Sequence, residues 1–233
     1  MGVVLLAGCG GDSKSAAKTA APRATTTSSG DPGRDVIEAF VAAAHAARAK
    51  AMWGLLSTAT KQRVGPYTRF RDHSARELAE GVGSFGRFRV IVSERITPEF
   101  GVVAIDGSRV AEGVRSRDVY AVALRLEGSA WRVELFSPVE VRPIGPDPGA
   151  HEDVVAQVAA SVSGVGGAGT SVLYLDGHAE SPKVYGTASN STVAVDFEPA
   201  LDPGWHTVVV FGSVGRNASA TGWWFTVARK PKS

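Results

Sequence analysis

The sequence has almost none of the residues from which disulfide frameworks and multi-cysteine metal sites are built. It contains one cysteine in 233 residues, which excludes an intramolecular disulfide and a multi-cysteine metal site. Its five histidines show neither the H-x-x-x-H nor the H-E-x-x-H spacing that brings two imidazoles to one metal ion. The G-x-S-x-G turn of many serine hydrolases is also missing. We therefore expect no metal and no cofactor, and these absences favour a non-catalytic protein.

Long apolar runs and clusters of like charge are missing as well. No stretch reaches the roughly 18 uninterrupted apolar residues of a membrane span. Arginines are interleaved with acidic residues and the net charge is only +2, so we expect no basic face for nucleic acid. Hydrophobic residues make up 44% of the chain and charged residues 21%, which is typical of a protein with a folded core.

The single cysteine, Cys9, follows a short apolar run in VVLLAGCGG. The four residues Leu6-Ala7-Gly8-Cys9 resemble the lipobox of bacterial lipoproteins, in which an apolar residue and two small residues precede the lipidated cysteine. The resemblance implies that Cys9 carries a diacylglyceryl group, whose two acyl chains suffice for a stable membrane anchor. The protein would then be extracytoplasmic and anchored to the bacterial cell membrane.

The residues on either side of Cys9 fit that interpretation. Residues 1–8 are expected to be part of a signal peptide. They include no Lys or Arg, so the true start of the signal peptide should lie upstream. Residues 9–33 are rich in Gly, Ser, Thr and Ala and nearly free of large apolar side chains. Such a segment buries little surface, and we expect a lipidated, flexible tether.

Residues 34–143 begin with a helical pattern. Apolar side chains recur at three- and four-residue spacings from Val36 to Leu56, which predicts helices with a bend between them. Ser74 and Glu77 have the spacing of a capping box, which predicts a further helix that begins at Ala75.

After Phe88 the apolar period changes from helical to strand-like. Alternating residues predict four antiparallel strands, the second of which ends at Asp106-Gly107. Helices followed by an antiparallel meander define an α+β order. The segments VIEAFVAAAHAARAKAMWGLLSTATKQRVG and VYAVALRLEGSAWRVELF resemble the nuclear transport factor 2-like superfamily. That resemblance implies a cone in which helices pack on a curved antiparallel sheet, a fold that hosts enzymes, binding modules and inert domains alike.

The last part of the chain reads as all-β. Residues 144–150 are rich in Pro and Gly and predict a stiff linker. Residues 151–229 contain six or seven short strand patterns separated by turn residues, which favours a β-sandwich. The segment LDPGWHTVVVFGSVGRNASATGWWFTV resembles the last hairpin of bacterial immunoglobulin-like domains, and VLYLDGH resembles an early strand and turn of that fold.

Strand alternation places four large apolar residues on one outer face of this sandwich: Trp205, Val209, Phe211 and Trp224. An exposed apolar patch usually marks an interface. Two interpretations remain open, since the face can dock on the first domain or can bind a partner or glycan.

The cone of the first domain is the other candidate site. Its resemblance to ketosteroid isomerases implies an acidic base and a tyrosine in an apolar pocket. Tyr67, Tyr120 and Glu134 are the candidate pocket residues. Asp72 is a weaker candidate, because it lies, close to Tyr67, in the charged stretch 69–73, which we interpret as a solvated loop. No pair stands out from the sequence.

The favoured function is a non-catalytic binding module on a cell-envelope lipoprotein. Its partners would be the membrane, through the lipid on Cys9, and an envelope protein, a polysaccharide or a small apolar ligand. A small-molecule enzyme of the ketosteroid isomerase type and a structural spacer are the alternatives.

Overall fold

The structure, a computed structural model, describes residues 32–111, 113–165, 169–187 and 189–229. The expected signal peptide, Cys9 and the expected tether up to residue 31 lie outside the described residues. The first helix, α1, spans Pro32–His45, so its start overlaps the end of the segment expected to be a tether. Proline is well suited to the first turn of a helix, because its missing N–H has no partner there.

Helices form the first part of the described chain, as predicted. After α1 they are α2 (Ala49–Leu55), α3 (Thr58–Val64), α4 (Tyr67–Arg69), a π-helical segment η1 (Phe70–Ser74), α5 (Ala75–Glu80) and a 3₁₀ turn η2 (Val82–Ser84). The interpretation of residues 69–73 as a loop is wrong, since they are helical and Phe70 is fully buried. Ser74 is itself helical and its side chain makes no capping hydrogen bond. The π-helical segment runs directly into α5, so the expected capping box does not form.

Sheet A follows the helices and is antiparallel in the order β1-β2-β3-β4. Its strands are β1 (Phe85–Arg95), β2 (Phe100–Ala111), β3 (Val114–Glu127) and β4 (Ala130–Glu134). The second strand was predicted to end at Asp106-Gly107, but it continues to Ala111. A bulge in β1 explains this, because β1 approaches Gly107 so closely that an added Cβ would lie 2.5 Å from the carbonyl oxygen of Arg87. Glycine is therefore needed there for close approach rather than for a turn.

Two further sheets contain the strands of the second part. Sheet B has the order β10-β11-β7-β5, and sheet C has the order β6-β13-β12-β8-β9. Their bounds are β5 (Glu140–Gly145), β6 (His151–Glu152), β7 (Gln157–Ser163), β8 (Gly169–Leu175), β9 (His178–Ala179), β10 (Lys183–Thr187), β11 (Asn190–Asp196), β12 (Gly204–Val214) and β13 (Asn217–Val227). Strand β5 pairs with β7, so pairing with the second part begins before the segment 144–150 that was expected to be a linker.

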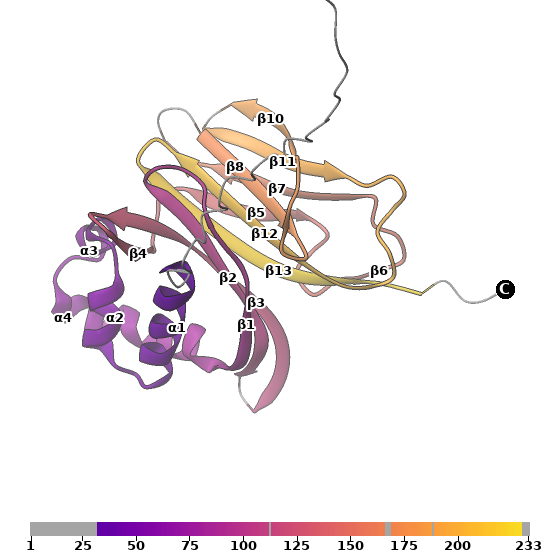
Figure 1. Cartoon of the computed structure of the whole chain (residues 1–233). Coiled ribbons are helices and arrows are strands. Elements are labelled where there is room, and N and C mark those ends of the chain that lie inside the picture. Colours follow the sequence, from indigo (N-terminus) through magenta and orange to yellow (C-terminus); the bar gives the residue numbers. More distant parts are fainter. Residues whose placement is uncertain (1–31, 112, 166–168, 188, 230–233) are drawn as a thin grey trace, which may run out of the picture.

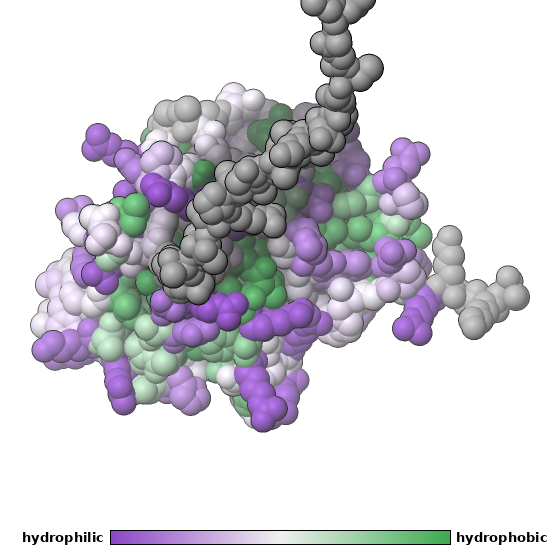
Figure 2. Space-filling view, in the orientation of Figure 1, coloured by the Kyte–Doolittle hydropathy of each residue, from purple (hydrophilic) through white to green (hydrophobic). Residues whose placement is uncertain are grey.

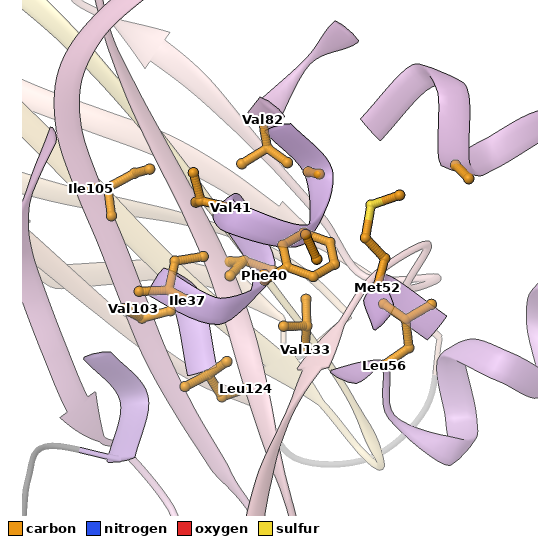
Figure 3. Close-up of a cluster of buried hydrophobic side chains, with 14 of the residues drawn as sticks. Ile37, Phe40, Val41, Met52, Leu56, Val82, Val103, Ile105, Leu124 and Val133 are labelled. Atoms are coloured by element: carbon orange, nitrogen blue, oxygen red, sulfur yellow. The ribbon is translucent and has the colours of Figure 1, made fainter. Parts of the chain in front are cut away.

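The elements stack in the order helices, sheet A, sheet C and sheet B (Figure 1). Apolar side chains of α1 such as Ile37 and Phe40 fill the space against Val103 and Leu124 of sheet A (Figure 3). A second cluster fills the space between sheets B and C. The mixed α+β class, with N-terminal helices and antiparallel sheets, is thus confirmed.

A third cluster, which we call the interlayer core, joins sheet A to sheet C. Sheet A contributes Val102 and Ala121 among others, and sheet C contributes Tyr174, Val209 and Phe211. Sheet A therefore packs against other layers on both of its faces. No helix among the described residues has the length and apolarity needed to cross a bilayer.

Candidate functional site

The four residues predicted on one outer face of the second part have two different environments. Val209 and Phe211 are buried in the interlayer core. Trp224 is partly buried, and Trp205 is 48% exposed. The face is thus covered by sheet A at one end and open to solvent at the Trp205 end.

The open end of this face is an aromatic pair that contacts an arginine of sheet A. The ring centroids of Trp205 and Trp224 are 4.4 Å apart. The guanidinium of Arg117 lies 5.0 Å from the centroid of the Trp205 ring, within the range of a cation–π interaction. The indole Nε1 of Trp224 donates a hydrogen bond of 2.7 Å to the carbonyl oxygen of Arg117, which ties β13 to β3.

The buried carboxylate of Asp106 fixes Arg117 and a second arginine, Arg89, beside the aromatic pair. Asp106 accepts hydrogen bonds from Nε and Nη2 of Arg117 at 2.7 and 2.6 Å, and from Nε and Nη2 of Arg89 at 3.1 and 3.0 Å. Burial alone would raise the pKa of Asp106, but the two guanidinium groups hold that pKa below its usual range. We call Arg89, Arg117, Trp205 and Trp224 the arginine–tryptophan corner.

A cavity of about 340 Å³ opens at this corner. Its lining includes Arg89, Arg117 and Trp205, together with Asp176 and Thr207. The carboxylate of Asp176 accepts hydrogen bonds from the backbone N–H of Thr207 and lies 2.8 Å from Nδ1 of His206. His206 is therefore a structural residue that holds the loop bearing Asp176 in place.

On the face seen in Figure 2, hydrophilic residues are dispersed around apolar surface rather than gathered in one patch.

The structure does not bring together the three residues expected in a cone pocket. Tyr67 packs against Trp53, with ring centroids 5.9 Å apart. Tyr120 faces the helices as part of the apolar cluster there, and burial raises the pKa of its hydroxyl. Glu134 lies opposite Ala123, whose side chain is in the interlayer core. Since directly opposed residues share a face, Glu134 and Tyr120 lie on opposite sides of sheet A.

Glu134 is instead the centre of a buried ion-pair network. Its carboxylate accepts a hydrogen bond of 2.5 Å from Ser57 and bonds of 3.0 and 3.2 Å from Arg125. Nη2 of Arg63 lies 2.9 Å from Oε1. Burial alone would raise the pKa of Glu134, but these donors lower it. A carboxylate held in this way is a poor proton acceptor, so the network has a structural role.

The network also connects the two parts of the chain. Arg63 donates to the side-chain oxygen of Asn217 at 2.8 Å, and Arg125 donates to the carbonyl oxygen of Arg216 at 2.5 Å. Both acceptors lie at the turn between β12 and β13. Asp72, the weaker candidate, is exposed and pairs with its neighbour Arg71.

Sequence reasoning missed the arginines of the corner. The signal was available, because Arg87-x-Arg89 and Arg115-x-Arg117 each place two guanidinium groups on one face of a strand. The sequence alone does not show that β1 and β3 both pair with β2. This pairing brings the two arginine-bearing faces side by side. Among the described residues, no group of three or more His, Cys, Asp or Glu is arranged to hold a metal ion.

The chain matches no protein-family model, and a search of curated proteins finds no significant match.

Proposed function

We propose that this protein is a bacterial cell-envelope lipoprotein whose folded part is a non-catalytic binding module. The anchor is the lipid expected on Cys9, and residues 10–31 separate it from α1. The order of helices before an antiparallel sheet supports the likeness of the first part to the nuclear transport factor 2-like superfamily. Two layers of mainly antiparallel strands around one apolar core support the likeness of the second part to immunoglobulin-like domains.

The exposure of Trp205 carries the binding proposal. This indole is 48% exposed beside a cavity, although the neighbouring Val209 and Phe211 are buried under sheet A. A half-exposed aromatic ring that is held by a second ring and by a fixed guanidinium is preorganised for contact with a ligand. A purely structural spacer has no need to leave this ring open.

Catalysis of the ketosteroid isomerase type has less support. That chemistry requires a carboxylate and a tyrosine in one apolar pocket. Here Glu134 is neutralised by two arginines and lies on the opposite face of sheet A from Tyr120.

Two measurements test the proposed function, and both use the full chain expressed in a bacterial host behind a complete export leader. The first is labelling with radioactive palmitate. We expect the wild-type protein to be labelled and to fractionate with membranes, and we expect Cys9→Ser to lose both properties. Unlabelled wild-type protein would contradict the anchor.

The second measurement is retention of the Cys9→Ser protein on purified envelope polysaccharide and on envelope membranes. Trp205→Ala should lose retention. Phe136→Ala is the matched control, because Phe136 is also an exposed aromatic residue, with 49% exposure, outside the corner. Equal retention of the two variants would refute the assignment of the binding site.

A further inference from the structure

The outer end of sheet A extends past sheet C and carries four arginines on one face. Arg87 and Arg89 belong to β1, and Arg115 and Arg117 belong to β3. In Figure 1 the β2–β3 hairpin projects beyond β13. These arginines, which we call the arginine strip, line an open depression of about 600 Å³ together with Phe88, Asp106, Gly107, Ser108 and Ser116.

The depression has a strong positive charge. Among the described residues, four arginines line it against one acidic residue, Asp106, which is an excess of three positive charges. Asp106 orients Arg89 and Arg117. Arg87 and Arg115 are exposed and form no ion pair or side-chain hydrogen bond with any residue that the structure describes. Two guanidinium groups are thus fixed, and two have no partner among the described residues and could bind an external anion.

The depression is continuous with the arginine–tryptophan corner. Arg89 and Arg117 line both the depression and the smaller cavity beside Trp205. A ligand that lies along the arginine strip therefore reaches an aromatic face at one end. The hydrogen bond from Trp224 to the backbone of Arg117 fixes the positions of the charged and aromatic halves relative to each other.

We propose that this surface binds an acidic polysaccharide, with its carboxylate or phosphate groups on the arginine strip and a sugar ring against Trp205. Guanidinium groups bind both kinds of anion in a bidentate way. The C–H face of a pyranose ring complements an exposed indole. The inference rests on the proposed function and specifies the ligand of that binding module.

A membrane surface fits the geometry less well. Binding to a bilayer requires apolar anchors that protrude and insert among the lipids. Here the aromatic ring is in the wall of a cavity, between Trp224 and Arg117, and the charges line a depression.

The test is a binding titration of the full chain, carrying Cys9→Ser, with three polymers of similar length and with vesicles. The polymers are polygalacturonate, poly(glycerol phosphate) and neutral dextran, and the vesicles contain phosphatidylglycerol. We expect one or both acidic polymers to bind, with affinity that falls as salt rises, and we expect dextran not to bind. Loss of the fluorescence response in Trp205→Phe would locate the sugar ring.

The key variant is the double substitution Arg87→Ser and Arg115→Ser, which removes two side chains without a described partner and should leave the fold intact. It should weaken binding about 10-fold, because two exposed charge contacts are lost. The control is the double substitution Arg48→Ser and Arg69→Ser, which makes the same charge change at exposed helical-region residues. It should bind like the wild type.

Each other outcome overturns the inference in a distinguishable way. Binding to dextran as tight as to the acidic polymers would show an aromatic site for neutral sugars, and the binding function would stand. Binding to the vesicles alone would replace the glycan with a lipid headgroup. Equal weakening in both double variants would show non-specific charge attraction. If the protein binds none of these probes but is still retained on envelope material through Trp205, only the ligand class is rejected. If the protein also shows no retention on envelope material, the proposed binding function is rejected.

Discussion

Replacing Glu134 with glutamine tests the buried network that joins the helices, sheet A and the β12–β13 turn. The variant keeps the shape of the side chain but removes its charge. Its amide oxygen can still accept a hydrogen bond, whereas its NH₂ group would face the donors of Arg63 or Arg125. Removing one partner of a buried ion pair costs about 3–5 kcal/mol. The two arginines keep 22% and 16% of their side-chain surface exposed, so water can partly solvate them and the lower figure applies.

The expected effect is large enough for thermal denaturation to measure. A loss of about 3 kcal/mol in a domain of 150–250 residues lowers Tm by about 6–12 °C. The control is Glu38→Gln, a substitution on the exposed face of α1, which should change the free energy of unfolding by no more than about 0.5 kcal/mol.

The difference in Tm should also depend on pH in a defined direction. The pKa of Glu134 in the folded protein lies below its ordinary value of 4.5. The carboxylate therefore stabilises the fold above about pH 4.5 and loses this contribution as the pH falls through the lower, folded-state pKa. The gap between wild type and Glu134→Gln should be constant from pH 8 to about pH 5 and shrink below that. A gap under 2 °C at pH 7, or one that widens in acid, would refute the reasoning.

Two further substitutions test the interlayer core. Phe211→Ala removes a fully buried side chain and should lower the free energy of unfolding by about 3–5 kcal/mol. Circular dichroism should show the helices and strands melting together at a lower temperature. Helices that melt at the wild-type temperature would contradict a shared core. Gly222→Ala would place its Cβ 2.7 Å from Cγ1 of Val119 and 3.2 Å from Cβ of Ala121, and should cost about 1–3 kcal/mol. Gly54→Ala, which has open space, should be neutral or stabilising by up to about 1 kcal/mol in calorimetry.

Periodicity in the sequence was enough to predict the order of the elements but not all of their limits. Three- and four-residue spacings predicted the early helices, and alternation predicted the later strands. The stretch 69–73 was misread because four polar residues surround Phe70, and the burial of Phe70 at 0% exposure is a tertiary effect. Strand β2 was predicted too short because Asp106-Gly107 has the composition of a turn. Its glycine is required by the approach of β1, which depends on residues about 20 positions away.

The interlayer core explains why the candidate site was harder to predict than the fold. Alternation shows that Trp205, Val209 and Phe211 share a face, but not where another sheet stops covering that face. Sheet A covers Phe211, but its apolar contact with sheet C does not extend to Trp205. Toward that end, β3 changes from Ala121 and Val119 to Arg117, and on β2 the residue opposite Val119 is Asp106. An apolar surface with no further strand to cover it becomes charged at its margin, and the uncovered ring beside those charges is where we propose that a ligand binds.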